Sequence, residues 1–511
     1  MSLQTLERSL IDHPAALLRV IADLRGIALS AREHPLLAAE LANALADPVV
    51  IAVGLEELST GALEALAALA AQDGRLPASQ FQRQFGEIRP FGPGRLAREQ
   101  PWQAVTGPAE ELWYRGWIFR GFAQLDGIPT EFVYVPPEIL GLLPRRAASP
   151  FASAEAPAPI TFSDPRDALA VDATTLLAHV QTAGLRRERA GWAGADLQQL
   201  NRQLLCPDPA PATPIPSGRL ALLLHFLEKL GWSASTSRGE QHLNASAVRQ
   251  WLQLERARQW QTLWVAWLED ESWDDLRLLP ELVCEGGWRN DPPGTRRRLL
   301  TWLGQAEAGR WHTIAGWISA LKMTAPDFLR PTGDYDSWYI RYNGSETYLR
   351  GFAHWDDIEG RLARYLITGP LHWLGVVALD AASERMTVTA AGRSLLRGEA
   401  PPCPRPGDLV VKPDFAILVP TTASSFDRFR VARFAAWESS PRLGSDEPFR
   451  YRITRRSLLH AEAQGLTAER ALAFLRERVG DRLPENVARA LARWSRRDHS
   501  TTMRSSREHS L

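Results

Sequence analysis

The stretch HWLGVVALDAASERMTVTAAGRSLL, His372 to Leu396, decides how the rest of the chain is interpreted. A helical segment ends at Gly375, and glycine is the residue that most readily adopts the left-handed conformation that closes a helix. An apolar run, a polar turn and a second apolar run follow, as expected for a β-hairpin. Thr389 then begins another helix, because its hydroxyl can accept a hydrogen bond from the first turn. The pattern therefore predicts a helix, a hairpin and a capped helix in that order.

The same pattern occurs twice more upstream. One copy runs from Arg115-Gly116-Trp117 to Val135-Pro136, and the other from Leu230-Gly231-Trp232 to Leu243-Asn244. Two or three helices followed by a hairpin make the winged-helix arrangement, a relative of the helix-turn-helix. We therefore expect a mainly α fold with α+β modules, built from tandem winged-helix domains.

Changes in composition divide the chain into seven predicted parts. The parts are a helical SAP-like region (1–58), a winged-helix-like domain 1 (59–145), a Pro/Ala-rich linker (146–166), winged-helix-like domains 2 (167–292) and 3 (293–400), a small α/β domain (401–498) and a disordered tail (499–511).

The first part carries a second resemblance. Its segment LLRVIADLRGIALSAREHPLLAAELANAL resembles a SAP motif, although Ala31 stands where many SAP motifs have glycine. An ordinary helical hairpin is the alternative there.

Composition excludes several classes of protein. The 59 basic and 59 acidic residues balance, so the whole chain exerts no electrostatic attraction on nucleic acid. Three widely spaced cysteines indicate neither a disulfide framework nor a zinc site. No apolar run has the roughly 18 residues that a membrane span needs, and the N-terminus lacks a signal-peptide profile. We expect a cytoplasmic protein with no membrane partner.

A nucleotide-driven motor is also excluded. A P-loop places lysine directly after glycine, because backbone amides and the ammonium group share the phosphate charge. The three lysines of the chain follow other residues, namely Glu228, Leu321 and Val411. We expect no cofactor and no resident metal.

The last predicted domain carries a family resemblance. The stretches KPDFAILVP and FRYRITRRSLLHAEAQGLTAERALAFLRERVGDRLPENVARALARW resemble the N-terminal domain of XPB-type helicases. A related domain follows winged helices in the TFIIH subunit that anchors XPB, so the whole chain is similar in layout to that subunit. The resemblance implies a role in interaction, either pairing with a similar domain or positioning a helicase on DNA. It does not imply ATPase activity, because Asp446-Glu447 is followed by Pro448 and makes no helicase box.

Local excess of arginine is a further sign of nucleic-acid binding. From Tyr451 onward the chain has 13 arginines and seven acidic residues. Arginine can bridge two phosphate oxygens, so these residues predict contact with a DNA backbone; solvated helix faces with local ion pairs are the alternative. The candidate nucleic-acid-binding residues are Arg428, Arg430, Arg433, Arg455, Arg456, Arg496 and Arg497, with a second patch at Arg296, Arg297 and Arg298.

Two other features have a functional and a structural interpretation. Asp334 and Asp336 in GDYDSWYIR, with His354, could form an acid–base or metal site, but the same aspartates suit a turn. Trp260, Trp264 and Trp267 share one helix face, which could stack on unpaired bases but is more typical of a face buried between domains.

Three functional hypotheses follow. The first is a non-catalytic DNA-binding scaffold, whose winged helices contact DNA while the C-terminal domain recruits a partner such as a helicase. The second is a pure protein-interaction adaptor, which the zero net charge favours. An enzyme centred on Asp334, Asp336 and His354 is the least supported, and we expect no catalytic activity.

Overall fold

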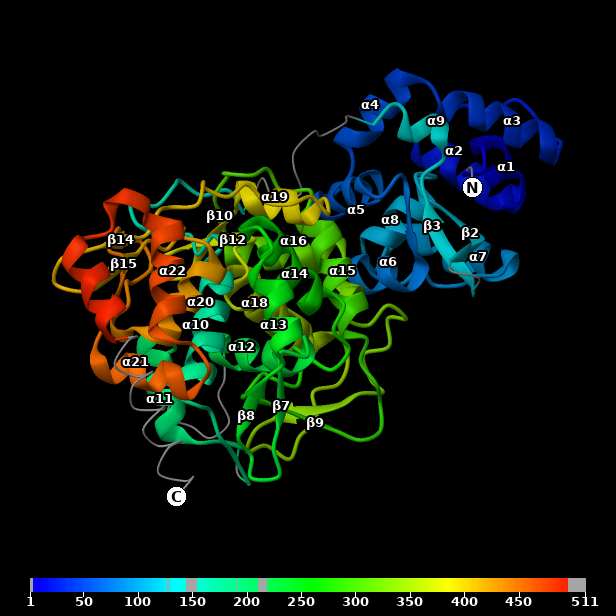
Figure 1. The fold of residues 1–511 in the computed structure, drawn as a ribbon. Helices are drawn as coiled ribbons and strands as arrows, with labels where there is room; N and C mark the ends of the chain where they lie inside the picture. The colour runs from blue at the N-terminus through cyan, green and yellow to red at the C-terminus, as the bar shows by residue number, and fades with distance from the viewer. Residues whose placement is uncertain (1–2, 126–127, 144–153, 190, 210–217, 495–511) are drawn as a thin grey trace. The chain divides into compact units, whose positions relative to one another are not determined.

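The computed structural model describes residues 3–125, 128–143, 154–189, 191–209 and 218–494 (Figure 1). About half of the chain is helical and the sheets are small and antiparallel, so the mixed α and α+β class is confirmed. The chain divides into two compact units. Unit 1 comprises Met1–Ala154, Leu282–Trp288 and Ala315–Gly360, and unit 2 comprises Glu155–Glu281, Arg289–Ile314 and Arg361–Leu511.

Unit 1 begins with helices that bury aliphatic side chains such as Leu18, Leu41 and Leu45. Its first group of elements ends in a three-stranded sheet of order β1-β3-β2. The elements are α1 (Leu6–Ile11), α2 (Ala15–Leu24), α3 (His34–Leu45), α4 (Pro48–Glu56), α5 (Thr60–Ala71), β1 (Arg75–Pro77), α6 (Ala78–Phe85), α7 (Pro93–Glu99), η1 (Pro101–Gln103), α8 (Pro108–Tyr114), β2 (Phe119–Leu125), β3 (Ile128–Tyr134) and α9 (Pro137–Leu140).

The rest of unit 1 comes from later in the chain. β9 (Leu282–Glu285) pairs with β11 (Tyr339–Tyr342), from the Tyr339↔Glu285 pair to the Tyr342↔Leu282 pair. The same unit contains η3 (Pro326–Phe328), η4 (Phe352–His354), the π-helix η5 (Asp356–Gly360) and all but the first residue of α16 (Ile314–Thr324).

Unit 2 contains two further groups of helices, each followed by a hairpin. The first group is β4 (Phe162–Ser163), α10 (Ala168–Thr182), β5 (Arg187–Glu188), β6 (Gly191–Trp192), α11 (Gly194–Gln203), α12 (Gly218–Lys229), β7 (Ser233–Ser235), β8 (Gln241–Leu243), α13 (Ala245–Leu252) and α14 (Arg256–Leu268). The second is α15 (Pro292–Leu303), β10 (His312–Thr313), α17 (Arg361–Thr368), α18 (Pro370–Trp373), β12 (Val377–Asp380), β13 (Arg385–Val388) and α19 (Ala390–Leu396).

The three groups share one order of elements along the chain. In each group a helix and a short extended segment come first, and at least two further helical segments follow before the hairpin. The short extended segment pairs with, or bridges beside, the second hairpin strand. These pairs are β1 with β3, the Arg186↔Glu240 bridge beside β8, and β10 with β13. The glycine before each hairpin is left-handed as predicted, with φ of +68° at Gly116, +63° at Gly231 and +74° at Gly375.

Part of the predicted linker is built into the third hairpin sheet. Glu155 bridges to His312 of β10 at one edge, and β4 pairs with β12 at the other edge. The segment between them is fastened by the Arg385 guanidinium, which donates to the Pro157 carbonyl at 3.1 Å. Residues Glu155 to Ser163 therefore occupy both edges of this sheet, and the earlier part of the linker, 144–153, lies outside the described residues.

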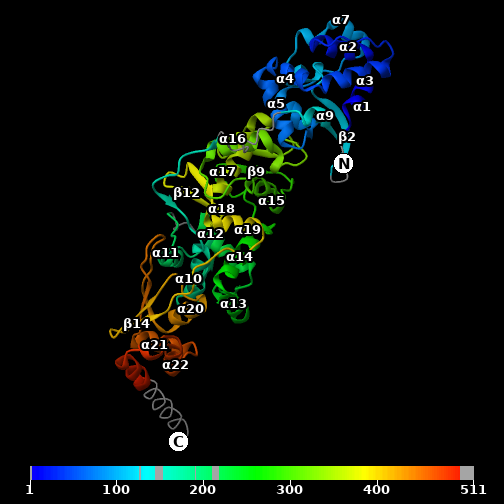
Figure 2. The same cartoon turned by 90° about the horizontal axis from the view of Figure 1, so that it is seen from above.

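The C-terminal block is a four-stranded antiparallel sheet with helices. Its elements are β14 (Val410–Val411), β15 (Ala416–Val419), α20 (Ser425–Phe434), β16 (Ala436–Ser439), β17 (Phe449–Arg452), α21 (Arg455–Ala463), α22 (Ala468–Val479) and η6 (Gly480–Arg482), and the strand order is β14-β15-β17-β16. α20 packs against α10, and the two helices lie side by side in both views (Figures 1 and 2).

No single helix in the described ranges is long and apolar enough to cross a membrane. The pair α3 and α4, bent by 75°, passes that test on length and composition alone.

Candidate nucleic-acid and protein interfaces

Arg428 lies in the core and holds α20 against α10. Its side chain is 2% exposed, and its guanidinium donates to the Val171 carbonyl at 3.0 Å and to the Thr175 hydroxyl. The same group lies 3.5 Å above the centre of the Phe449 ring. Because every face of the guanidinium is enclosed by protein, we leave Arg428 out of any proposed phosphate contact.

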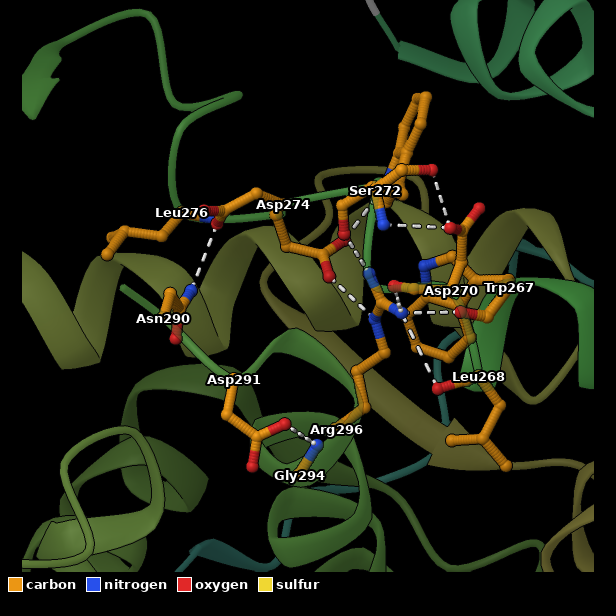
Figure 3. Close-up of polar contacts among 12 residues, drawn as sticks. Trp267, Leu268, Asp270, Ser272, Asp274, Leu276, Asn290, Asp291, Gly294 and Arg296 are labelled. Carbon is orange, nitrogen blue, oxygen red and sulfur yellow. Dashed lines mark hydrogen bonds and ion pairs between the residues drawn. The ribbon is translucent and has the colours of Figure 1, made fainter. Parts of the chain in front are cut away.

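Arg296 is enclosed in a similar way at the end of α14 (Figure 3). It is fully buried, and its Nε donates to Asp275 Oδ2 at 2.7 Å. Its two terminal nitrogens donate to the carbonyls of Trp267, Asp270 and Trp273. Carbonyls at a helix C-terminus have no partner within the helix, so Arg296 supplies the donors that α14 and the following loop need.

The two neighbours of Arg296 contact carboxylates at the surface. Arg297 forms an ion pair with Glu269, and both side chains are about half exposed. Arg298 Nη1 lies 3.8 Å from Asp291 Oδ2, and burial lowers the pKa of Arg298. The predicted second patch therefore consists of one core arginine and two with acidic neighbours.

The remaining candidate arginines differ in exposure. Arg430 stacks 4.4 Å above the Phe474 ring, and Arg433 donates to the Gln464 carbonyl at 3.2 Å. Arg455 and Arg456 are exposed at the first two positions of α21. The last two candidates, Arg496 and Arg497, lie outside the described residues.

The C-terminal sheet carries a charge ladder that the sequence analysis did not identify. Arg450 and Arg452 of β17 lie between Glu438 of β16 and Asp414, with Arg450 Nε 2.8 Å from Glu438 Oε2 and Arg450 Nη2 3.5 Å from Asp414 Oδ2. Hydrogen bonds from Arg452 and Arg450 lower the pKa of Glu438. The available signal was the alternation in FRYRIT, which places both arginines on one face of a strand and the buried Phe449 and Tyr451 on the other.

In a winged helix the helical segment before the hairpin is the one that enters DNA. Here that segment is α8, α12, or α17 followed by the short α18, and α8 contains no basic residue. In α8, Glu110 is fully buried. Burial alone would raise the pKa of Glu110, but hydrogen bonds from Arg89 and Thr106 outweigh burial and lower it to about 2. Arg89 Nε and Nη2 each lie 2.7 Å from that carboxylate.

The corresponding helices of unit 2 use their basic residues in ion pairs. Arg219 and Lys229 of α12 pair with Asp172 and Asp270, while the Leu and Phe side chains between them are buried. In α17, Arg361 contacts Glu281 at 3.9 Å and Arg364 contacts Glu384 at 3.1 Å. The basic residues of these helices therefore all have acidic partners.

The aspartates of GDYDSWYIR shape a turn. Asp334 Oδ1 accepts hydrogen bonds from the backbone N–H groups of Asp336 and Ser337 at 3.0 and 3.1 Å, which is an Asx turn. His354 Nδ1 lies 2.8 Å from Asp357 Oδ2. In the part of the chain that the structure describes, no group of three or more His, Cys, Asp or Glu side chains is arranged to hold a metal ion.

Arg330 and Glu359 form a buried ion pair in unit 1 that the sequence did not predict. Arg330 Nε lies 2.8 Å from Glu359 Oε1, and the two side chains are 2% and 0% exposed. Burial raises the pKa of Glu359 to about 7 despite the neighbouring guanidinium. Nearby, Asp327 accepts hydrogen bonds from Arg83 at 2.8 and 2.9 Å and from the Tyr335 hydroxyl at 2.6 Å. No spacing in the sequence brings the whole set together, because Arg83 and Glu359 lie outside the segment that holds Asp327, Arg330 and Tyr335.

The tryptophan face of α14 is part of the core. Trp260, Trp264 and Trp267 are each 3% exposed or less, and Trp260 Nε1 donates to the Leu374 carbonyl at 2.6 Å. The face is therefore buried, as the structural interpretation predicted, and its contact with Leu374 lies within unit 2.

Comparison of the chain with protein-family models and with curated proteins found no match.

Proposed function

We propose that this chain is a non-catalytic, cytoplasmic scaffold protein of the helicase-associated type. Its helix–hairpin modules are winged-helix domains that serve mainly as packing units, and its C-terminal block docks a partner protein such as an XPB-type helicase. The observation that carries this proposal concerns the helices before the hairpins: α8 contains no basic residue, and the arginines and lysine of α12 and α17 are paired with carboxylates. A winged helix that grips DNA through this helix needs free donors there.

The order of elements supports the winged-helix assignment. In that fold the short strand after the first helix joins the hairpin at its second strand, and β1-β3-β2 and β10-β13-β12 both have this order. The modules of unit 2 also bury their helices against other parts of the chain, as Arg428 and the α14 tryptophans illustrate. Such modules build a rigid frame for a binding domain.

The C-terminal sheet offers the docking surface. One face of the sheet presents Val410 of β14, which is 46% exposed, and the ladder of Glu438, Arg450 and Arg452, with Leu418 of β15 between them. β14 and β16 are the two edge strands of this sheet. An edge strand with an exposed apolar side chain, as β14 has in Val410, is suited to pairing with a strand of another protein.

Calorimetric titration of the full chain with the N-terminal domain of an XPB-type helicase tests this proposal. We expect binding that Val410→Asp weakens at least tenfold, because a charge would be buried at the interface. Val265→Asp is the matched control, since Val265 on α14 is 47% exposed. Absence of binding by the parent chain, or equal weakening by both substitutions, would refute this docking surface.

A second candidate function is DNA binding through Arg455 and Arg456. Both side chains are exposed, and both occupy the N-terminal turn of α21, where the helix dipole disfavours cations and attracts anions. A phosphate would relieve that unfavourable placement. Fluorescence anisotropy with duplex, single-stranded and forked DNA at increasing salt measures this binding. Salt-sensitive binding that weakens in Arg455→Ala/Arg456→Ala supports it, and no binding at low salt leaves the pure adaptor.

A further inference from the structure

α4 in unit 1 turns an apolar row outward. Val49 and Val53, one helical turn apart, are 69% and 53% exposed, while Ile51 on the other side of the helix is buried. A helix on a protein surface normally presents polar side chains to water. Within unit 1, this row therefore has the character of a contact surface.

A groove runs beside the row. Arg25, Val49, Val50, Val53, Gly54 and Glu57 line a hollow of about 120 Å³. Engineered cavities of about 150 Å³ hold a benzene molecule, so this hollow suits one aliphatic side chain. Gly54 keeps the groove compact, because a Cβ at this position would lie 2.6 Å from Cζ of Arg25.

The wall of the groove is fixed. Arg25 Nη2 donates to the Val50 carbonyl at 3.0 Å, and its guanidinium lies 4.2 Å from the centre of the Trp117 ring. Trp117 is fully buried, so the arginine rests on the core of unit 1. Because this wall is already ordered, binding in the groove loses little side-chain entropy.

The charge around the row is acidic. From Asp47 to Asp73 the chain has five carboxylates and no lysine, arginine or histidine. All five are exposed, namely Asp47, Glu56, Glu57, Glu64 and Asp73. The facing basic groups are Arg25, which is held on Trp117, and Arg115, whose Nη1 lies 2.7 Å from Glu57 Oε2. Both ends of α4 therefore remain acidic, at Asp47 and at Glu56.

The acidic charge around the row distinguishes between the partners that could bind there. A second copy packed antiparallel on α4 would bring Asp47 against Glu56, and a parallel copy would bring each acidic end against itself. An anionic lipid surface would be repelled by the same carboxylates. A cationic amphipathic helix satisfies both the apolar row and the acidic ends.

We propose that α4 binds an amphipathic helix of a partner protein, with an aliphatic anchor in the groove and lysine or arginine flanking its apolar stripe. This surface extends the scaffold role to unit 1. It uses no residue of the C-terminal block, so its test is independent of the test of helicase docking.

Two synthetic peptides of 18 residues test the proposal by fluorescence anisotropy with the full chain. They share leucines at positions i, i+3, i+4 and i+7, and differ only in having lysine or glutamate at the flanking positions. We expect the lysine peptide to bind at least tenfold more tightly than the glutamate peptide. Val49→Ser/Val53→Ser should weaken the lysine peptide at least fivefold, while Val105→Ser, an exposed valine elsewhere in unit 1, should leave it unchanged.

Three results would overturn the proposal. Equal affinity for both peptides would remove charge selection, and unchanged affinity in Val49→Ser/Val53→Ser would remove α4 as the site. Sedimentation velocity that shows a dimer of the parent chain, lost in the same variant, would identify a second copy as the occupant. Binding to vesicles of anionic phospholipid, also lost in that variant, would identify a lipid surface.

Discussion

The runs Arg296–Arg298 and Arg455-Arg456 look alike in sequence, but the fold buries the first residue of one run and leaves both residues of the other exposed. Both are clusters of arginine near the start of a helix. Arg296 is fully buried, with carbonyl and carboxylate acceptors around it, whereas Arg455 and Arg456 are exposed. The difference teaches that the density of charge along a chain does not determine which charges reach a ligand.

The two runs differ because hydrogen-bond acceptors for arginine lie close to Arg296. α14 ends beside Arg296, and the carbonyls of Trp267, Asp270 and Trp273 need donors that the helix cannot provide. At the start of α21 the unsatisfied backbone groups are N–H donors, and Thr454 and Ser457 accept and donate there in a capping box. A helix N-terminus therefore does not supply Arg455 and Arg456 with the free carbonyls that surround Arg296.

Replacing Arg296 should have the largest effect. Arg296→Met leaves three carbonyls and Asp275 without their donor, so we expect a loss of about 3–5 kcal/mol in the stability of unit 2. Urea unfolding followed by tryptophan fluorescence measures it. Arg297→Met is the adjacent control, and its loss of an exposed ion pair should cost about 0.5 kcal/mol or less. Similar losses in both variants would contradict the contrast between buried and exposed arginines.

Arg428→Met should rank second, because it removes donors to Val171 and Thr175 and the stacking on Phe449. We expect a loss of about 2–4 kcal/mol, as for other broken buried polar networks. Arg430→Met, on the same helix, keeps its contact with Phe474 and should cost less than about 1 kcal/mol. The C-terminal block should also become sensitive to protease in Arg428→Met alone; equal sensitivity in both variants would argue against the α20–α10 contact.

Two buried carboxylates extend the comparison to pH. Glu359 has a folded pKa of about 7, above its ordinary value of 4.5, so the folded chain retains a proton that the unfolded chain loses between pH 4.5 and 7. Stability should therefore fall as pH rises through that window, and Glu359→Gln should flatten this part of the profile. Glu110, with a folded pKa of about 2, should act in the opposite sense, since its contribution is present above pH 4.5 and lost as pH falls toward 2.

Urea midpoints of the parent, Glu359→Gln and Glu110→Gln between pH 3 and 8 check both signs. A parent profile that rises between pH 4.5 and 7 and is unchanged in Glu359→Gln would show that Glu359 is ionised throughout that range.

The exposed pair should give the smallest change in stability. Arg455→Ala/Arg456→Ala should shift the unfolding free energy by about 0.5 kcal/mol or less, as is usual for exposed positions. If these arginines contact phosphate, the slope of log affinity for DNA against log salt should fall by about one for each residue removed. A large loss of stability would instead indicate a structural role, and would remove these residues from the DNA-binding candidate.

Local signals in the sequence predicted much of the element order. The three helix-ending glycines are left-handed, and the side chains of Thr389 and Asn244 cap the helices that were expected to start there. These features depend on a few adjacent residues, because the backbone conformation of glycine and the capping hydrogen bond are both local. The likeness of the C-terminal block to the XPB-type domain and the division into seven parts stay predictions.

The candidate site was less accessible to prediction. No residue near Arg428 in the sequence predicts its hydrogen bonds to Val171 and Thr175, which lie more than 250 residues away. The pairing of Arg330 with Glu359, and of Glu155 with His312 at the sheet edge, likewise joins distant segments. The exposed valines of α4 belong to the same class, since their spacing in sequence is equally compatible with a buried helix.

By itself, the sequence determined the three helix-ending glycines, the caps at Asn244 and Thr389, the balance of charge, and the absence of a P-loop lysine. The glycines and caps depend on residues within one or two turns of each other, and the charge balance depends on composition alone. The tertiary structure decided which arginines are enclosed, which carboxylates have a raised pKa, and which apolar face of α4 is exposed. The reason is that burial depends on the elements that pack around a side chain, and these come from distant parts of the chain.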